Sequence, residues 1–217
     1  MNKELADKIT PRVLRNTYRD LGYPLHEDGK LNLFGVRALD MTAGTFNDIL
    51  GIHLVYRGKD TVILHPGTVD PGTYYFENPM NPEGTAVMKF QYVDDMYQEG
   101  LHKGYPALRQ VRPAYFYRIT KEEWVKDGGR EIKLEGKKLI FDIIYANMHR
   151  ASQWNVVYDI GLYSAACQVR QVNKDHLQLM QMVKNIKGSQ KRFGYALFGE
   201  QQFNFIGDLD PKTEKRI

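Results

Sequence analysis

The sequence predicts a mainly β protein, a sandwich or a barrel, with a few helices. Short apolar runs recur between residues 31 and 145, each bounded by glycine, proline or charge, a spacing typical of β-sandwiches and barrels. Aromatic residues are abundant, with 14 tyrosines and 10 phenylalanines among 217 residues, which favours strands. Helical periodicity is confined to one segment near the N-terminus and one after the single cysteine.

Three parts of the chain are expected from this pattern. Residues 1–30 are predicted as a helical appendage with a helix over Pro11–Leu21, because proline suits a first helical turn. Gly22-Tyr23-Pro24 would end that helix. Residues 31–207 are expected to form the main domain, and residues 208–217 a polar tail that frays.

The strands of the main domain are predicted in order along the chain. Leu31–Arg37 alternates as a strand does, and two apolar runs joined by the polar turn Arg57–Asp60 predict a hairpin. The other strand-like runs are residues 72–76, 85–92, 114–118 and 139–145. The end of the last run, Phe141–Tyr145, is apolar enough to predict a buried strand.

A helix is predicted after the cysteine. Asn173-Lys174-Asp175 suits a helix start, since asparagine and aspartate cap helices. Apolar residues then recur at helical spacing up to Ile186, and Gly188 ends the pattern.

Composition disfavours several classes of function. The formal net charge is +4, from 30 basic and 26 acidic residues, and no basic stripe interleaved with aromatics indicates nucleic-acid binding. No apolar run reaches the roughly 18 residues of a membrane span, and residues 1–19 lack the apolar stretch of a signal peptide. We therefore expect synthesis in a cytoplasm. Histidine and cysteine show no paired spacing, so neither a metal nor a cofactor is expected.

Cys167 is the only cysteine and cannot form an internal disulfide. On the residues alone, a cysteine among alanine and valine is more often a small buried hydrophobic residue than a nucleophile. The chemical alternative needs a base, and His149, expected at a strand end, is the candidate. Gly161 and Ala165-Ala166 would leave backbone amides free to stabilise an oxyanion.

The segment from His149 to Val183 resembles the L,D-transpeptidase catalytic-domain family. His149, Ile160-Gly161, Ser164 and Cys167 match the family's His-Gly, Ile-Gly and Ser-x-Gly-Cys pieces in order. Upstream, Thr68–Tyr74 resembles the family's turn into a strand.

Four positions depart from the family pattern, one of them Ala165, which stands where many members carry a second histidine. Arg150 and Ala166 replace glycines, and Arg170 lies three residues after the cysteine where the family has an arginine two residues after it.

The resemblance implies a catalytic site and a substrate class. Cys167 would attack a peptidoglycan stem peptide as a thiolate activated by His149, with Ser164 orienting the pair or binding the oxyanion. Water as acceptor would make the protein a carboxypeptidase or endopeptidase, and an amine would make it a transpeptidase. The candidate substrate-binding residues are His102, which lies in a loop between two glycines, Arg150, Tyr163 and Arg170.

The whole sequence also resembles a set of phage-encoded proteins. The shared segments are Asp70–Tyr74, Gly100–Leu108, His149–Ala151 and Ser164–Val169. A phage origin implies delivery to the cell wall by a virion or by lysis, and it favours hydrolysis. The expected partners are a peptidoglycan peptide and other virion proteins. The alternative is an inactive virion structural or wall-binding protein that keeps the fold.

Overall fold

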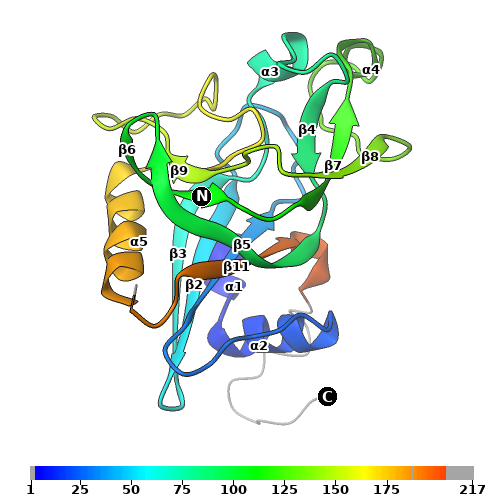
Figure 1. The fold of residues 1–217 in the computed structure, drawn as a ribbon. Helices are drawn as coiled ribbons and strands as arrows, with labels where there is room; N and C mark the ends of the chain where they lie inside the picture. Colours follow the sequence, from blue (N-terminus) through cyan, green and yellow to red (C-terminus); the bar gives the residue numbers. More distant parts are fainter. Residues whose placement is uncertain (1–2, 187, 204–217) are drawn as a thin grey trace.

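The computed structural model describes residues 3–186 and 188–203. Within these residues, eight strands form a closed barrel of mixed strand direction, with a three-stranded sheet beside it (Figure 1). The mainly β class is therefore confirmed, and the large sheet is a barrel. The predicted tail, residues 208–217, lies outside the described residues.

The barrel closes through strands that are far apart in the sequence. Its order is β1 (Leu31–Arg37), β11 (Arg192–Gly199), β5 (Gln91–His102), β6 (Tyr105–Gln110), β9 (Met148–Arg150), β10 (Gln168–Arg170), β3 (Lys59–Thr68) and β2 (Asp48–Tyr56), which returns to β1. The pairs β1–β11 and β9–β10 are parallel. Alternate residues of each strand fill the interior, among them the buried side chains of Leu33, Tyr97, Met148 and Leu197.

Two of the barrel hairpins have the same turn. In the predicted hairpin β2–β3, Arg57 and Gly58 join the strands with φ values of 49° and 73°. Lys103 and Gly104 join β5 to β6 with φ values of 48° and 87°. A two-residue turn with positive φ at both positions matches the twist of the flanking strands.

The small sheet consists of β4 (Thr85–Met88), β7 (Ala114–Ile119) and β8 (Lys138–Asp142), with β7 in the centre. The run 85–92, predicted as one strand, is divided between β4 and the start of β5. The prediction of a buried strand over Phe141–Tyr145 was wrong. β8 is an edge strand and the side chain of Phe141 is 57% exposed, because only one face of its sheet is covered.

Helices cover the barrel from outside. α1 (Lys3–Lys8) and α2 (Pro11–Asp20) pack against outward-facing residues of β1 and β11, such as Phe34 and Phe198. α2 begins as predicted at Pro11, and the Thr10 hydroxyl accepts a hydrogen bond from the Val13 amide. α5 (Asn173–Ile186) is the helix predicted after the cysteine, and it lies along the barrel (Figure 1).

One predicted strand is a helix. Residues 72–76 contribute to α3 (Thr73–Glu77), beside α4 (Lys121–Lys126) and the small sheet (Figure 1). The buried Phe76 ring stacks on Trp124 of α4, with ring centroids 4.4 Å apart. Tertiary packing here overrides the strand preference of the Tyr-Tyr-Phe run.

No helix in the described part of the chain is long and apolar enough to cross a membrane.

Candidate active site

A cavity of about 600 Å³ lies between the barrel and the small sheet. Its wall combines the end of β5, His149 of β9 and the segment just before β10 in the barrel with β4, β7 and β8 of the small sheet. Four of the residues singled out from the sequence line it: His102, His149, Tyr163 and Cys167. The cavity therefore joins the candidate nucleophile and base.

The parallel pairing of β9 and β10 places Cys167 and His149 on one face. His149 pairs with Val169 and Met148 with Gln168, and the Gln168 amide donates to the Asn147 carbonyl at 2.9 Å. Side chains alternate along strands. Since Met148 points into the barrel core, His149 points outward, as does Cys167 just before β10.

The two sequence segments that resemble L,D-transpeptidases are in contact. The Gly72 amide donates to the Ser164 carbonyl at 2.9 Å. A Cβ at Gly72 would clash with the carbonyl oxygen of Gly161, so this approach requires glycine. The buried Ser164 hydroxyl donates to the Cys167 carbonyl at 2.9 Å. Ser164 thus holds the backbone of the turn that carries the thiol.

Ala166 replaces the family glycine without backbone strain. The residue is buried in the main core cluster. Its φ is not positive, unlike that of five other non-glycine residues in the described chain. The conformation is therefore open to alanine.

The hydrogen bonds of His149 define its tautomer. Its Nδ1 lies 2.7 Å from the Arg150 carbonyl oxygen. Because a carbonyl only accepts, Nδ1 carries the proton and Nε2 is left as an acceptor. The Tyr105 hydroxyl donates to the same carbonyl at 3.3 Å. Nε2 is buried and has no hydrogen-bond partner among the described residues.

His102 stacks on His149 and has the opposite tautomer. The ring centroids are 4.0 Å apart and the planes differ by 9°. Asn147 accepts the Gln110 amide through Oδ1 at 3.0 Å, so its Nδ2 faces His102 Nδ1 at 3.4 Å. His102 Nδ1 is therefore the acceptor and its Nε2 carries the proton. Of the two rings, His149 has the free base nitrogen.

Burial keeps both candidate catalytic groups neutral. It raises the pKa of the Cys167 thiol to about 11, although the Asn147 backbone and the charge of Lys103 act in the opposite direction. Burial also lowers the pKa of His149 to about 3, and neighbouring His102 lowers it further. At neutral pH the site holds a thiol and an uncharged imidazole.

The thiol and the imidazole are not hydrogen-bonded to each other. The Cys167 Sγ lies 3.7 Å from the carbonyl oxygen of Tyr145, its hydrogen-bond acceptor. Tyr145 has a φ of 61°, which turns its backbone toward the thiol. The thiol proton is therefore directed at the Tyr145 carbonyl oxygen and not at His149 Nε2.

The two candidate arginines lie away from the cavity wall. The Arg150 guanidinium sits 4.1 Å from the centre of the Tyr105 ring and binds Gln153 at 3.1 Å. Arg170 is fully buried, and its Nε donates to His65 Nδ1 at 3.2 Å. The structure therefore brings His102 and Tyr163 to the nucleophile, but neither Arg150 nor Arg170.

The polar residues of the cavity wall that sequence reasoning missed include Lys103, Arg118 and Asn147. The pair Lys103-Gly104 has the same X-Gly pattern as the predicted turn at Arg57-Gly58, and it could have revealed the β5–β6 hairpin. Arg118 breaks an apolar alternation with Ala114 and Phe116. Asn147 has no local signal.

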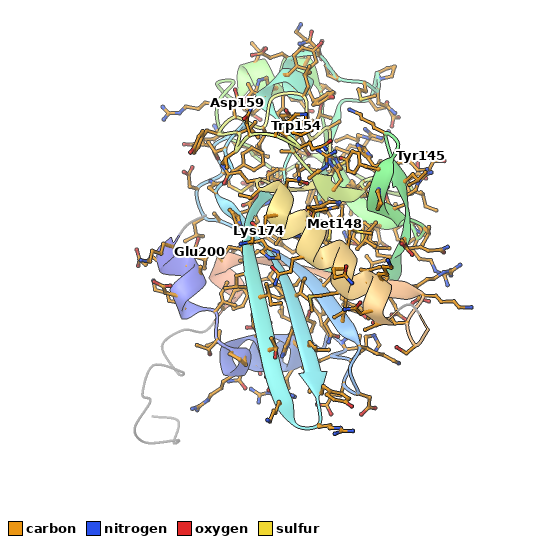
Figure 2. All side chains as sticks on the ribbon, turned by 90° about the vertical axis from the view of Figure 1, so that its left-hand side faces the viewer. Tyr145, Met148, Trp154, Asp159, Lys174 and Glu200 are labelled. Atoms are coloured by element: carbon orange, nitrogen blue, oxygen red, sulfur yellow. The ribbon has the colours of Figure 1, made fainter. Side chains whose placement is uncertain are left out.

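The long connection between β9 and β10 carries exposed aromatic side chains. Trp154 and Tyr158 are 83% and 82% exposed. In Figure 2 the loop with Trp154 and Asp159 lies above the end of α5 that holds Lys174. The same loop continues to Leu162 and Tyr163 on the cavity wall.

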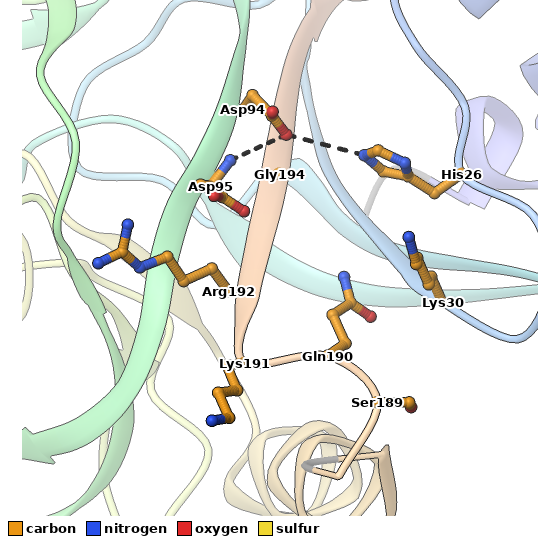
Figure 3. A pocket seen from close by; sticks show the side chains of 9 residues that line it. All are labelled: His26, Lys30, Asp94, Asp95, Ser189, Gln190, Lys191, Arg192 and Gly194. Carbon is orange, nitrogen blue, oxygen red and sulfur yellow. Dashed lines mark hydrogen bonds and ion pairs between the residues drawn. The ribbon is translucent and has the colours of Figure 1, made fainter.

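A second cavity, of about 430 Å³, lies elsewhere on the barrel (Figure 3). Charges of both signs line it, namely those of Lys30, Asp94, Asp95, Lys191 and Arg192, and His26 lies among them. His26 Nε2 approaches the Asp94 carboxylate at 3.7 Å. The one hydroxyl among its described lining residues, that of Ser189, donates to the Ile186 carbonyl at 3.0 Å.

The chain matches no protein family model, no curated protein and no solved structure. The likeness to L,D-transpeptidases thus rests on the motif residues.

Proposed function

We propose that the protein is a cysteine-dependent acyl-transfer enzyme of L,D-transpeptidase type that hydrolyses peptidoglycan stem peptides. One observation carries the proposal. Cys167 and His149 line the same cavity, and His149 Nδ1 carries the proton, which leaves Nε2, without a hydrogen-bond partner among the described residues, able to accept one.

The neutral pair dictates the order of proton transfer. A thiol with a pKa near 11 does not ionise to an imidazole with a pKa near 3 before substrate binds. Instead, His149 Nε2 takes the thiol proton as Sγ bonds to the carbonyl carbon of the substrate. The carbonyl π electrons move to oxygen, and backbone amides near Cys167 stabilise the oxyanion.

The intermediate then collapses in the usual manner of acyl transfer. The C–N bond breaks, and His149 gives its proton to the leaving amine. A thioester remains on Cys167. Water attacks it with His149 again as base, which releases the acid and restores the thiol. An amine in place of water would form a cross-link.

The substrate class is inferred from the motif resemblance and from the cavity rim. The resemblance points to stem peptides, and the exposed Trp154 and Tyr158 offer flat apolar surfaces on the loop that continues to Tyr163 of the cavity wall. The phage-like segments favour hydrolysis over cross-linking.

Purified muropeptides incubated with the protein test the proposal. Mass spectrometry should detect shortened peptides with the wild-type protein and none with Cys167→Ala. Because the substitution removes only the Sγ atom, whose hydrogen bond to the Tyr145 carbonyl is long, at 3.7 Å, the variant should stay folded, which circular dichroism checks. Unchanged muropeptides with the wild-type protein would refute the proposed activity.

A second candidate is a wall-binding or virion protein that keeps the fold without turnover. The raised thiol pKa and the absent Sγ to Nε2 hydrogen bond, in the described structure, favour it. Co-sedimentation with purified sacculi in the absence of any released peptide would support this candidate.

A further inference from the structure

Arg118 is a cation on an otherwise apolar face of the small sheet. Along β7, Ala114 and Phe116 point to the same side as Arg118, and both belong to the main hydrophobic core. Opposite Arg118 on β4 lies Ala86, which leaves room for the guanidinium. Arg118 is 9% exposed and lines the cavity that holds Cys167.

One edge of this guanidinium has no partner. Nη1 donates to the Gly84 carbonyl at 2.8 Å. Nε is buried and has no hydrogen-bond acceptor within the residues the structure describes. The edge formed by Nε and Nη2 is the one that arginine uses to bind a carboxylate through two parallel hydrogen bonds.

The nearby acids do not pair with Arg118. Glu83 and Asp142 act on it only through space. Glu83 instead pairs with Lys138 at 2.6 Å, and Asp142 accepts the Ile143 amide at 2.7 Å. In the described part of the chain, no carboxylate lies within 4 Å of the Arg118 guanidinium. A buried cation without a counter-ion is costly, which favours an anionic ligand.

The charges of the whole cavity wall agree with an anionic ligand. Lys103 and Arg118 are its cations, and Asp142 is its one acid among the described lining residues. Lys103 lies near enough to Cys167 to influence the thiol electrostatically. Arg118 belongs to β7 of the small sheet, whereas Cys167 precedes β10 of the barrel, so the two residues line the cavity from different sheets.

We propose that Arg118 binds a carboxylate of the peptide whose carbonyl faces Cys167. This inference rests on the proposed function and deepens it, since it assigns the substrate an anionic group at a distance from the scissile bond. A terminal carboxylate would make the site an exopeptidase site. A side-chain carboxylate would leave both exopeptidase and endopeptidase activity open.

Binding to Cys167→Ala tests the inference separately from turnover. Calorimetry would compare acetyl-dialanine, its C-terminal amide and acetyl-glutamyl-alanine amide. We expect the acid to bind at least about tenfold more tightly than the simple amide. If acetyl-glutamyl-alanine amide also binds more tightly than the simple amide, by the same factor as the acid, a side-chain carboxylate can make the same contact with Arg118.

Variants of Arg118 locate the effect. Arg118→Gln should remove the preference for the acid, and Arg118→Lys should retain part of it because the charge remains. Arg112→Gln, which removes an exposed arginine before the same strand, should leave the preference unchanged. If Arg118→Gln fails to fold, the lysine variant still reports the loss of bidentate geometry.

Two results would overturn the inference. The first is equal binding of acid and amide, or binding of neither at peptide concentrations of about 10 mM. The second is a preference for the acid that survives in both Arg118 variants. Absence of muropeptide hydrolysis by the wild-type protein would refute the proposed function and would leave a measured preference for the acid intact.

Discussion

The two cavities of this protein differ in how their polar groups are satisfied. In the cavity of Figure 3, His26 Nε2 lies 3.2 Å from the Tyr92 hydroxyl and 3.7 Å from the Asp94 carboxylate, and the lining includes both cations and acids. In the cavity of Cys167, His149 Nε2 and Arg118 Nε are buried without partners among the described residues. Native proteins satisfy most buried polar groups. Among the described lining residues, the cavity of Cys167 therefore has two buried nitrogens that a ligand could satisfy, and the cavity of Figure 3 has none.

Among the variants that test this difference between the cavities, His149→Asn should have the largest effect on activity. Loss of the general base should lower kcat/KM on muropeptides by about 10²–10⁴-fold. The matched variant His26→Asn changes a histidine of the other cavity and should leave kcat/KM within about twofold. Equal losses in the two variants would remove the distinction between the cavities.

The next largest effect should be seen in how the rate of Cys167 alkylation depends on pH. Because burial raises the pKa of Cys167 to about 11, the thiolate fraction at pH 7 should be about 300-fold below that of a free cysteine. Labelling by iodoacetamide should therefore be slow at pH 7 and rise about tenfold per pH unit up to pH 10. Rapid labelling near pH 6 would instead show a preformed thiolate–imidazolium pair.

Gly72→Ala should give the smallest of these effects, a loss of about 2–3 kcal/mol in the free energy of unfolding. Its Cβ would meet the backbone carbonyl of Gly161, which cannot move without displacing the turn of Cys167. In the other cavity, Gly194→Ala would meet only the end of the Tyr92 side chain. It should cost less than half as much, as measured by urea unfolding of both variants.

If Gly72→Ala and Gly194→Ala lower the free energy of unfolding by the same amount, the contact between the two motif segments adds nothing to stability.

Local signals in the sequence predicted local structure. The start of α2 at Pro11, the β2–β3 hairpin and α5 all follow from caps, turn residues and periodicity. α3 was predicted as a strand because nothing local reports that Phe76 stacks on Trp124, 48 residues later in the chain. β8 was predicted to be buried because apolar content does not show whether a sheet edge is covered.

The site itself depends on contacts that are distant in sequence. The motif identified Cys167, His149 and Ser164, and the structure places Cys167 and His149 on one cavity. The stacking of His102 on His149 depends on β6 lying between β5 and β9 in the barrel, and no local pattern encodes that order. Arg118 enters the wall from a different sheet, so only the tertiary fold brings it there.

The most direct test of the central claim is to trap the thioacyl-enzyme. The protein would be incubated with muropeptides and quenched in acid, and its peptides analysed by mass spectrometry. The account predicts an acyl adduct on the peptide that contains Cys167, removable by hydroxylamine and absent from Cys167→Ala. Shortened muropeptides formed equally well by Cys167→Ala, or an unmodified Cys167 with no muropeptide products, would contradict it.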